Sequence, residues 1–203
     1  MNDSSGDARD GVSDLDAPVQ VVAGGRFVEL RRQGHWEYAA RVGGLGAAFI
    51  LALTDADEIV LVEQYRVPVA ARVIELPAGV VGDHADDAGE SARQAAVREL
   101  EEETGFRGRH VRHLHRGPTA PGLCAERLDL FEVTGLERVG AGGGADADED
   151  IVVHIVPLEG APEWLREAER HGALIDARVY AGLWFAEHRT ERAASDANGG
   201  RRS

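Results

Sequence analysis

The sequence has a single cysteine, Cys124, among its 203 residues, so no disulfide can form within the chain. That scarcity is typical of proteins from a reducing compartment. The sequence also lacks any run of about 18 apolar residues, the length that a membrane-spanning helix needs. Residues 1–20 have no basic segment followed by an apolar one, as a secretory signal would. We therefore expect a cytoplasmic protein with no membrane association.

Basic residues are outnumbered by acidic ones. The chain has 22 basic residues against 36 aspartates and glutamates, a formal net charge of -14 at pH 7. This balance argues against nucleic acid as a partner, because binding by phosphate neutralisation needs a basic face. If the ligand is itself anionic, metal ions or a few well-placed arginines must bridge it to so acidic a protein.

Length and composition predict one principal domain, since 203 residues that are 43% hydrophobic can bury one ordinary core. Both ends are small, polar and turn-rich, which is typical of weakly ordered segments. The predicted organisation is a flexible acidic N-terminus (1–18), a small antiparallel β lobe (19–44), the main domain (45–189) and a flexible tail (190–203).

Hydrophobic patterning predicts an α+β fold. Runs rich in β-branched and aromatic residues, separated by Gly or Asp turns, indicate strands at 26–32, 35–42, 46–54 and 58–67 in antiparallel hairpins. Further strands are expected at 110–116, 127–133 and 151–158, and helices at 90–104, 161–172 and 174–189. Strands on both sides of a central helix, closed by a terminal helix, predict an α/β/α sandwich with a mixed sheet.

Two details of these helices can be predicted as well. Gly105 is expected to end the first helix as its C-terminal cap. Five residues of the last two helices are expected in the core: Trp164, Leu165, Val179, Leu183 and Trp184.

The helix at 90–104 carries an unusual concentration of carboxylates. On a helix, Glu99, Glu102 and Glu103 share one face, whereas Glu101 points elsewhere. Like charges at this spacing repel, and the helix dipole disfavours anions near a C-terminus. A divalent cation held by several carboxylate oxygens would offset both effects, and Arg98 could orient one carboxylate. The alternative is a solvated acidic face with no ligand.

Residues 98–106 read R-E-L-E-E-E-T-G-F, which resembles the signature of Nudix hydrolases, and Glu90 matches the earlier glutamate of that signature. Its first glycine matches Gly79 if the following loop carries five extra residues. The resemblance implies a Nudix-type fold and hydrolysis of a nucleoside diphosphate linked to another group. It further implies Mg²⁺ or Mn²⁺ bound by Glu99, Glu102, Glu103 and the carbonyl of Ala78, with Arg98 as an orienting partner and Glu102 also counted as catalytic.

Three stretches outside the signature resemble ADP-ribose pyrophosphatases: E-Q-Y-R (63–66), E-L-P-A-G (75–79) and P-G-L-C-A-E-R-L-D-L-F (121–131). Pro121 lies fifteen residues after Phe106, where that subfamily has a marker proline. The likeness implies substrate contacts from Arg66, Glu75, Pro121 and Gly122, and a homodimer formed through the N-terminal strands. Trp36 could stack on an adenine ring or pack a sheet or subunit interface.

The general base has several candidates. Family members place it on an acidic loop, which here spans 146–150. Glu149, Asp148 or Glu126 could accept the proton of the attacking water. The expected function is Mg²⁺-dependent hydrolysis of ADP-ribose to AMP and ribose 5-phosphate. The rival functions are hydrolysis of another nucleoside diphosphate derivative, such as GDP-mannose, a UDP-sugar or NADH, and nucleotide sensing without catalysis.

Overall fold

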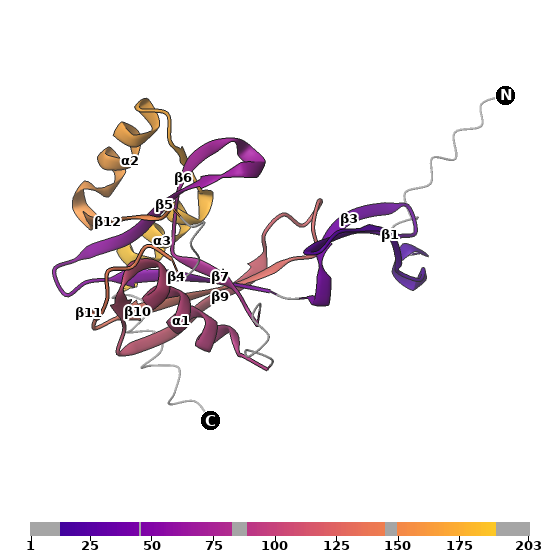
Figure 1. The fold of residues 1–203 in the computed structure, drawn as a ribbon, viewed down its shortest axis with the longest axis horizontal. Helices are drawn as coiled ribbons and strands as arrows, with labels where there is room; N and C mark the ends of the chain where they lie inside the picture. The colour runs from indigo at the N-terminus through magenta and orange to yellow at the C-terminus, as the bar shows by residue number, and fades with distance from the viewer. Residues whose placement is uncertain (1–12, 45, 83–88, 145–149, 190–203) are drawn as a thin grey trace.

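The computed structural model of the chain describes residues 13–44, 46–82, 89–144 and 150–189. A small antiparallel sheet of three strands comes first, and Figure 1 shows it standing apart from the larger body. Two backbone hydrogen bonds join it to the 119–126 segment, from Ala39 to Leu123 and from Ala125 to Ala39. Its strands are β1 (Gln20–Gly24), β2 (Val28–Gln33) and β3 (Trp36–Arg41).

The larger sheet has eight strands in the order β13-β6-β5-β4-β10-β9, with β12 paired to β5 and β7 to β4. Two pairs, β10 with β4 and β13 with β6, are parallel, and the others are antiparallel. The sheet is therefore mixed, as predicted. Its strands are β4 (Ala47–Leu53), β5 (Glu58–Arg66), β6 (Ala71–Glu75), β7 (Ala78–Val80), β9 (His110–Pro118), β10 (Arg127–Thr134), β12 (Val152–Pro157) and β13 (Leu174–Ile175).

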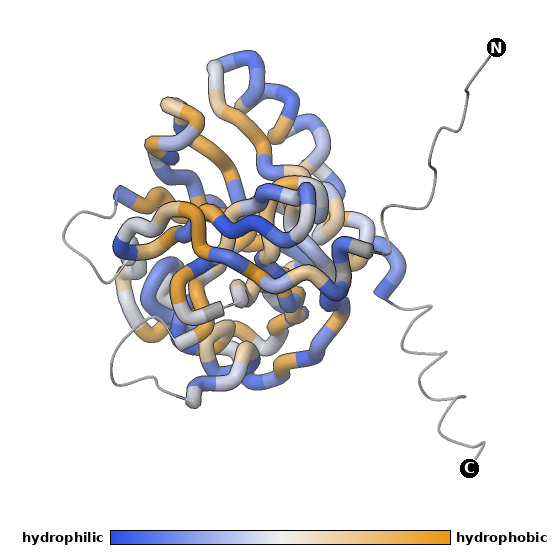
Figure 2. Tube along the Cα trace, turned by 90° about the vertical axis from the view of Figure 1, so that its right-hand side faces the viewer, coloured by the Kyte–Doolittle hydropathy of each residue, from blue (hydrophilic) through white to orange (hydrophobic). Residues whose placement is uncertain are grey.

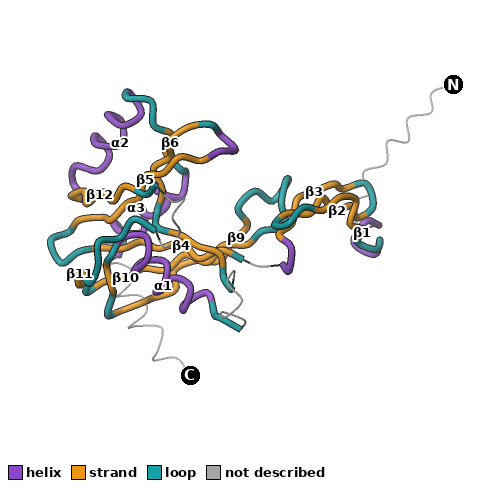
Figure 3. The backbone as a smooth tube through the Cα atoms, in the orientation of Figure 1, coloured by secondary structure: helices purple, strands orange, loops and turns teal. Residues whose placement is uncertain are grey.

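Helices cover both faces of this sheet (Figures 1 and 3). Side chains alternate between the faces of a strand, so every residue of β4 is buried: those at odd positions pack with α2 and α3, and those at even positions with α1. Figure 2 shows apolar segments, coloured orange, running through the body. The predicted α/β/α sandwich is confirmed. Its helices are α1 (Ala92–Thr104), α2 (Ala161–Arg170) and α3 (Ala177–Glu187).

Helix α1 has a defined cap at each end. The Ser91 hydroxyl accepts a hydrogen bond from the Gln94 N–H, while the Gln94 side chain accepts one from the Ser91 N–H, which is a capping box. Ser91 therefore stands outside the helix, which begins two residues later than predicted. Gly105 ends it in the left-handed conformation at φ 72°, as its position in the sequence predicted.

Two predictions about the C-terminal region were wrong. Leu174 and Ile175 were expected to begin a helix, but they form β13, parallel to β6, and Asp176 then caps α3. Trp184 was expected in the core, yet it is 52% exposed and its indole stacks on the His188 ring on the outside of α3. Leu165 and Val179 are fully buried, as predicted.

Several short elements complete the fold and were not predicted individually. They are the two-stranded pair β8 (Phe106–Arg107) and β11 (Glu137–Arg138), and the 3-10 turns η1 (Ser13–Asp16), η2 (Val42–Gly44), η3 (Val67–Val69) and η5 (Leu158–Gly160).

Among the described residues, no helix is both long enough and apolar enough to cross a bilayer.

Candidate functional site

Arg98 is the centre of the carboxylate cluster on α1. Its Nε lies 3.1 Å from Glu90 Oε1, and its Nη1 lies 2.9 Å from Glu99 Oε1 and 3.0 Å from Glu102 Oε2. The hydrogen bonds to Glu90, helped by the charge of Glu99, raise the pKa of the guanidinium well above its ordinary value. Arg98 is therefore a permanent cation that holds three carboxylates in place. Glu101 lies apart from them, as the helical spacing predicted, and it pairs with Arg107.

The strand β7 lies directly against this face of α1. The Ala78 N–H donates to Glu103 Oε2 at 3.0 Å. A Cβ atom built on Gly79 would lie 1.8 Å from Glu99 Oε1, so only glycine allows the approach. The Gly82 N–H donates to Glu90 Oε2 at 3.0 Å, which joins the chain on the two sides of residues 83–88.

The donor atoms of this cluster suit a hard divalent cation. Glu99 and Glu103 are only 9% and 5% exposed. The cluster contains four carboxylates, those of Glu90, Glu99, Glu102 and Glu103, against the single guanidinium of Arg98. Carboxylate and carbonyl oxygens are the ligands that Mg²⁺ and Mn²⁺ prefer. In the described ranges, no three Asp, Glu, His or Cys side chains are grouped closely enough to hold a metal ion. Arg98 binds Glu99 and Glu102, and the Ala78 N–H binds Glu103.

A cavity of about 400 Å³ opens on the other side of β7. Ala78, Gly79 and Val80 line one part of it, which places it beside the carboxylate cluster. Its charged lining consists of three arginines and three carboxylates: Arg41, Arg66, Arg178, Glu75, Glu126 and Asp176. The structure thus brings together four of the predicted metal, substrate and catalytic residues, which are Arg66, Glu75, Ala78 and Glu126.

Each arginine of this cavity is paired with one carboxylate. The Nε–oxygen distances are 2.6 Å from Arg66 to Glu75, 2.5 Å from Arg41 to Glu126 and 2.7 Å from Arg178 to Asp176. Sequence reasoning did not find Arg41, Asp176 or Arg178. These residues follow no local motif and come from β3 and the start of α3, which the fold brings together from distant parts of the chain.

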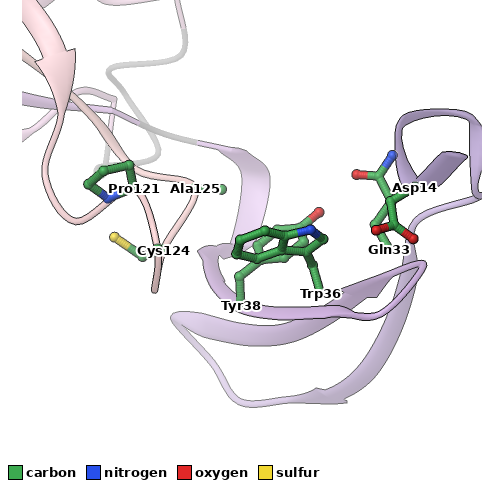
Figure 4. A pocket seen from close by; sticks show the side chains of 8 residues that line it. Asp14, Gln33, Trp36, Tyr38, Pro121, Cys124 and Ala125 are labelled. Atoms are coloured by element: carbon green, nitrogen blue, oxygen red, sulfur yellow. The ribbon is translucent and has the colours of Figure 1, made fainter. Parts of the chain in front are cut away.

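The other predicted substrate contacts lie in a different cavity. Trp36, Pro121 and Gly122 line a space of about 350 Å³ between the three-stranded sheet and the 119–126 segment. Figure 4 shows the Trp36 and Tyr38 rings close together on β3, facing Pro121 and Cys124 across the cavity. The aromatic residues and the arginines therefore do not share one cavity within a single chain.

The candidates for the general base fall in three places. Glu126 lines the cavity with the three arginines and is bound to Arg41. Glu149 and Asp148 lie outside the described residues. Asp150, which follows them, is paired with Arg72, whose guanidinium also binds Glu63.

Comparison with known proteins agrees with this geometry. A family model for the NUDIX domain matches residues 44–177, well over half of the chain. The chain belongs to the Nudix family. The matched residues include the Nudix signature on α1 and Gly79 on β7. They also include four of the six charged residues of the neighbouring cavity, which are Arg66, Glu75, Glu126 and Asp176.

Curated relatives resemble this Nudix chain over much of its length. The methanol dehydrogenase activator of Bacillus methanolicus is 35% identical over 122 residues, 60% of this chain and 63% of that protein. The ADP-ribose pyrophosphatase of Bacillus subtilis is 33% identical, over 63% of this chain and 66% of its own length. The ADP-ribose pyrophosphatase of Mycobacterium tuberculosis is 34% identical, over 68% and 63% respectively. The matched part thus spans a little under two thirds of these relatives.

A solved structure has the same fold as this Nudix chain. The crystal structure of an ADP compounds hydrolase superimposes with a TM-score of 0.67 and covers 87% of this chain and 93% of that one. The two sequences are 21% identical, so the likeness concerns the fold.

Proposed function

We propose that this protein hydrolyses the pyrophosphate bond of ADP-ribose, or of a related nucleoside diphosphate sugar, with Mg²⁺ or Mn²⁺ as cofactor. The observation that carries the proposal is the position of β7, which has the carboxylate cluster of α1 on one side and the cavity with three arginines on the other. The names of the pyrophosphatase relatives support the choice of substrate.

The reaction divides the substrate between its two phosphates. Water attacks one phosphorus, the bond from that phosphorus to the bridging oxygen breaks, and ADP-ribose yields AMP and ribose 5-phosphate. A metal ion held by Glu99, Glu102, Glu103 and the Ala78 carbonyl would neutralise the pyrophosphate and lower the pKa of the water. Arg98 orients two of those carboxylates.

The remaining residues bind substrate and take up the proton. Arg66 presents a guanidinium, which matches the geometry of a phosphate, and Glu75 holds it through Nε. A carboxylate accepts the proton of the attacking water, and Glu149, Asp148 and Glu126 are its candidates. Trp36, with Pro121 and Gly122 opposite, offers a flat apolar surface on which an adenine ring can stack.

The proposed partner is a second copy of the chain, with neither nucleic acid nor membrane involved. Val21, Phe27 and Val28 of the N-terminal segment are each more than half exposed, an arrangement expected of a surface that another protein covers. The single cysteine supports a cytoplasmic location.

Product analysis across a substrate panel tests the proposal. The panel contains ADP-ribose, GDP-mannose, UDP-glucose and NADH, each assayed with Mg²⁺ and with a chelator. We expect metal-dependent release of AMP, chiefly from ADP-ribose. Turnover confined to another compound would change the substrate. No turnover on any of them, with one compound raising the melting temperature, would replace catalysis with nucleotide sensing.

A further inference from the structure

The first turn of α3 enters the cavity with the three arginines. The parallel pairing of β13 with β6 places this turn beside the cavity. The Asp176 N–H then donates to the Ile74 carbonyl of β6 at 2.9 Å. Asp176 Oδ1 accepts two hydrogen bonds of 2.7 Å, from the N–H and from the Nε of Arg178, and Oδ2 pairs with Nη2. One carboxylate therefore both caps the helix and holds the guanidinium.

The Arg178 guanidinium is fixed on a second side by an aromatic ring. Its Cζ lies 4.2 Å from the centre of the Phe49 ring, a cation–π contact. Phe49 belongs to β4 and is 7% exposed, so the ring itself is held by the core. Arg178 therefore has little freedom to change its position, although it lines an open cavity.

Part of each guanidinium remains open toward a ligand. Arg178 uses Nε and Nη2 for Asp176, whereas Arg41 and Arg66 use Nε for Glu126 and Glu75. In the part of the chain that the structure describes, the Nη1 of Arg178 and both Nη groups of the other two arginines have no hydrogen-bond partner. Such N–H groups can bind phosphate oxygens.

Asp176 and Arg178 are both charged at neutral pH. Burial tends to raise the pKa of Asp176, but the hydrogen bonds from Arg178 outweigh it and lower that pKa below its ordinary value. Burial likewise tends to lower the pKa of Arg178, and the hydrogen bonds with Asp176 raise it overall. A phosphate entering the cavity would therefore meet a fixed cation.

The geometry points to Arg178 as a substrate-binding residue, with Asp176 as its positioning residue, in a subsite that takes a sugar phosphate without needing a metal. This inference rests on the proposed function and deepens it. Three guanidiniums can donate to the phosphate, while the carboxylates of Glu75, Glu126 and Asp176 can accept from sugar hydroxyls.

Calorimetric titration of ribose 5-phosphate in the presence of a chelator tests the subsite. Wild-type protein should bind, and Arg178→Gln should bind about tenfold more weakly or worse, because a charged hydrogen bond is lost. Arg178→Lys keeps the charge without the planar fork and should also be weaker. Arg116→Gln is the matched control: Arg116 is bound by Asp129 through two nitrogens but lies outside this cavity, so binding should be unchanged.

The role of Asp176 in positioning Arg178 can be tested separately, by kinetics and by chemical rescue. Asp176→Asn keeps a good helix cap but loses the charge that holds Arg178, so KM for ADP-ribose should rise several-fold with less change in kcat. In Arg178→Ala, added guanidinium ion should restore part of the lost affinity, which a purely structural role would not allow. The melting temperature of each variant reports on its fold, and Arg178→Lys serves if Arg178→Gln does not fold.

Two outcomes separate this inference from the proposed function. If wild-type protein binds ribose 5-phosphate in chelator but hydrolyses no member of the panel, the proposed function is wrong and the subsite stands. If it hydrolyses ADP-ribose while folded Arg178 variants bind ribose 5-phosphate as wild type does, the subsite is wrong. Absence of any binding by wild-type protein in chelator also overturns the subsite.

Discussion

At the scale of single residues, Glu103 combines burial, a negative charge and a backbone contact. Its carboxylate is held by the Ala78 N–H, next to the carbonyl proposed as a metal ligand. Glu103→Gln keeps the volume and an oxygen that can accept this hydrogen bond, but it removes the charge. We expect kcat/KM to fall more than about 100-fold, since even the outer partners of metal ligands are worth about 10–100-fold. The melting temperature should change little.

Glu101→Gln is the control for this prediction. Glu101 lies on the same turn of α1, but it points away from the cluster and pairs with Arg107. Steady-state kinetics at several Mg²⁺ concentrations should therefore show near wild-type values for Glu101→Gln. Equal activity of the two variants would remove Glu103 from the proposed metal site.

The residues of the site differ in how far the sequence predicts them. Helical spacing predicted that Glu101 points away from the face shared by Glu99 and Glu102, because helical geometry is local. The need for glycine at position 79 depends on the approach of Glu99, which a signature match can suggest. Arg178 has no such signal, since its place in the cavity depends on the pairing of β13 with β6.

At the scale of elements, a polar contact joins β9 and β10 on one face of the sheet. Asp129 on β10 is 8% exposed and is bound by Arg116 and His113 of β9. Burial tends to raise the pKa of Asp129, but the hydrogen bonds from Arg116 and His113 lower it below the ordinary value of 3.8. The ionised carboxylate therefore stabilises the folded state.

Because the pKa of Asp129 is lowered in the folded state, the direction in which pH changes the free energy of unfolding can be predicted. The stabilisation by Asp129 is complete above its ordinary pKa of 3.8 and is lost as the pH falls below that value through the folded pKa. Urea unfolding of wild type and Asp129→Asn between pH 3 and 7 should show a difference in unfolding free energy that is largest at neutral pH and shrinks toward pH 3. A difference that stays constant over this range would contradict the assignment.

Element prediction succeeded for long patterns and failed for short ones. The strands around β4 and β5 have enough alternating or continuous apolar residues to be recognised. β13 has two residues, too few for any period, and its neighbouring apolar residues resemble a helix in sequence. Trp184 shows the related limit, because a large apolar side chain does not reveal which face of α3 is covered.

At the scale of the whole molecule, all the basic side chains are of one type. The chain has no lysine, so all 22 of its basic residues are arginines. A guanidinium can bind a carboxylate through Nε and still present its outer N–H groups, which an ammonium cannot do in the same fixed plane. This is how an acidic protein can keep three arginines paired with carboxylates in one cavity and still offer donors to an anion.

Many exposed apolar side chains lie on or beside the three-stranded sheet. Of the 18 large hydrophobic residues exposed in the described ranges, eight lie between Val19 and Val42. A three-stranded sheet needs a covered hydrophobic face for its stability. The body of the same chain contacts it chiefly through the 119–126 segment, so we expect a second copy to cover its outer face.

Sedimentation equilibrium should then show a dimer, and Val28→Asp should weaken it. Val28 lies on β2, the central strand of the sheet, and is 51% exposed, so an aspartate there disturbs little within one chain but places a charge in the proposed interface. Val139→Asp, at a residue 42% exposed on the larger body, should leave the dimer intact. If wild-type protein sediments as a monomer at every concentration, the exposed face of the sheet must serve another partner, and the homodimer proposal is wrong.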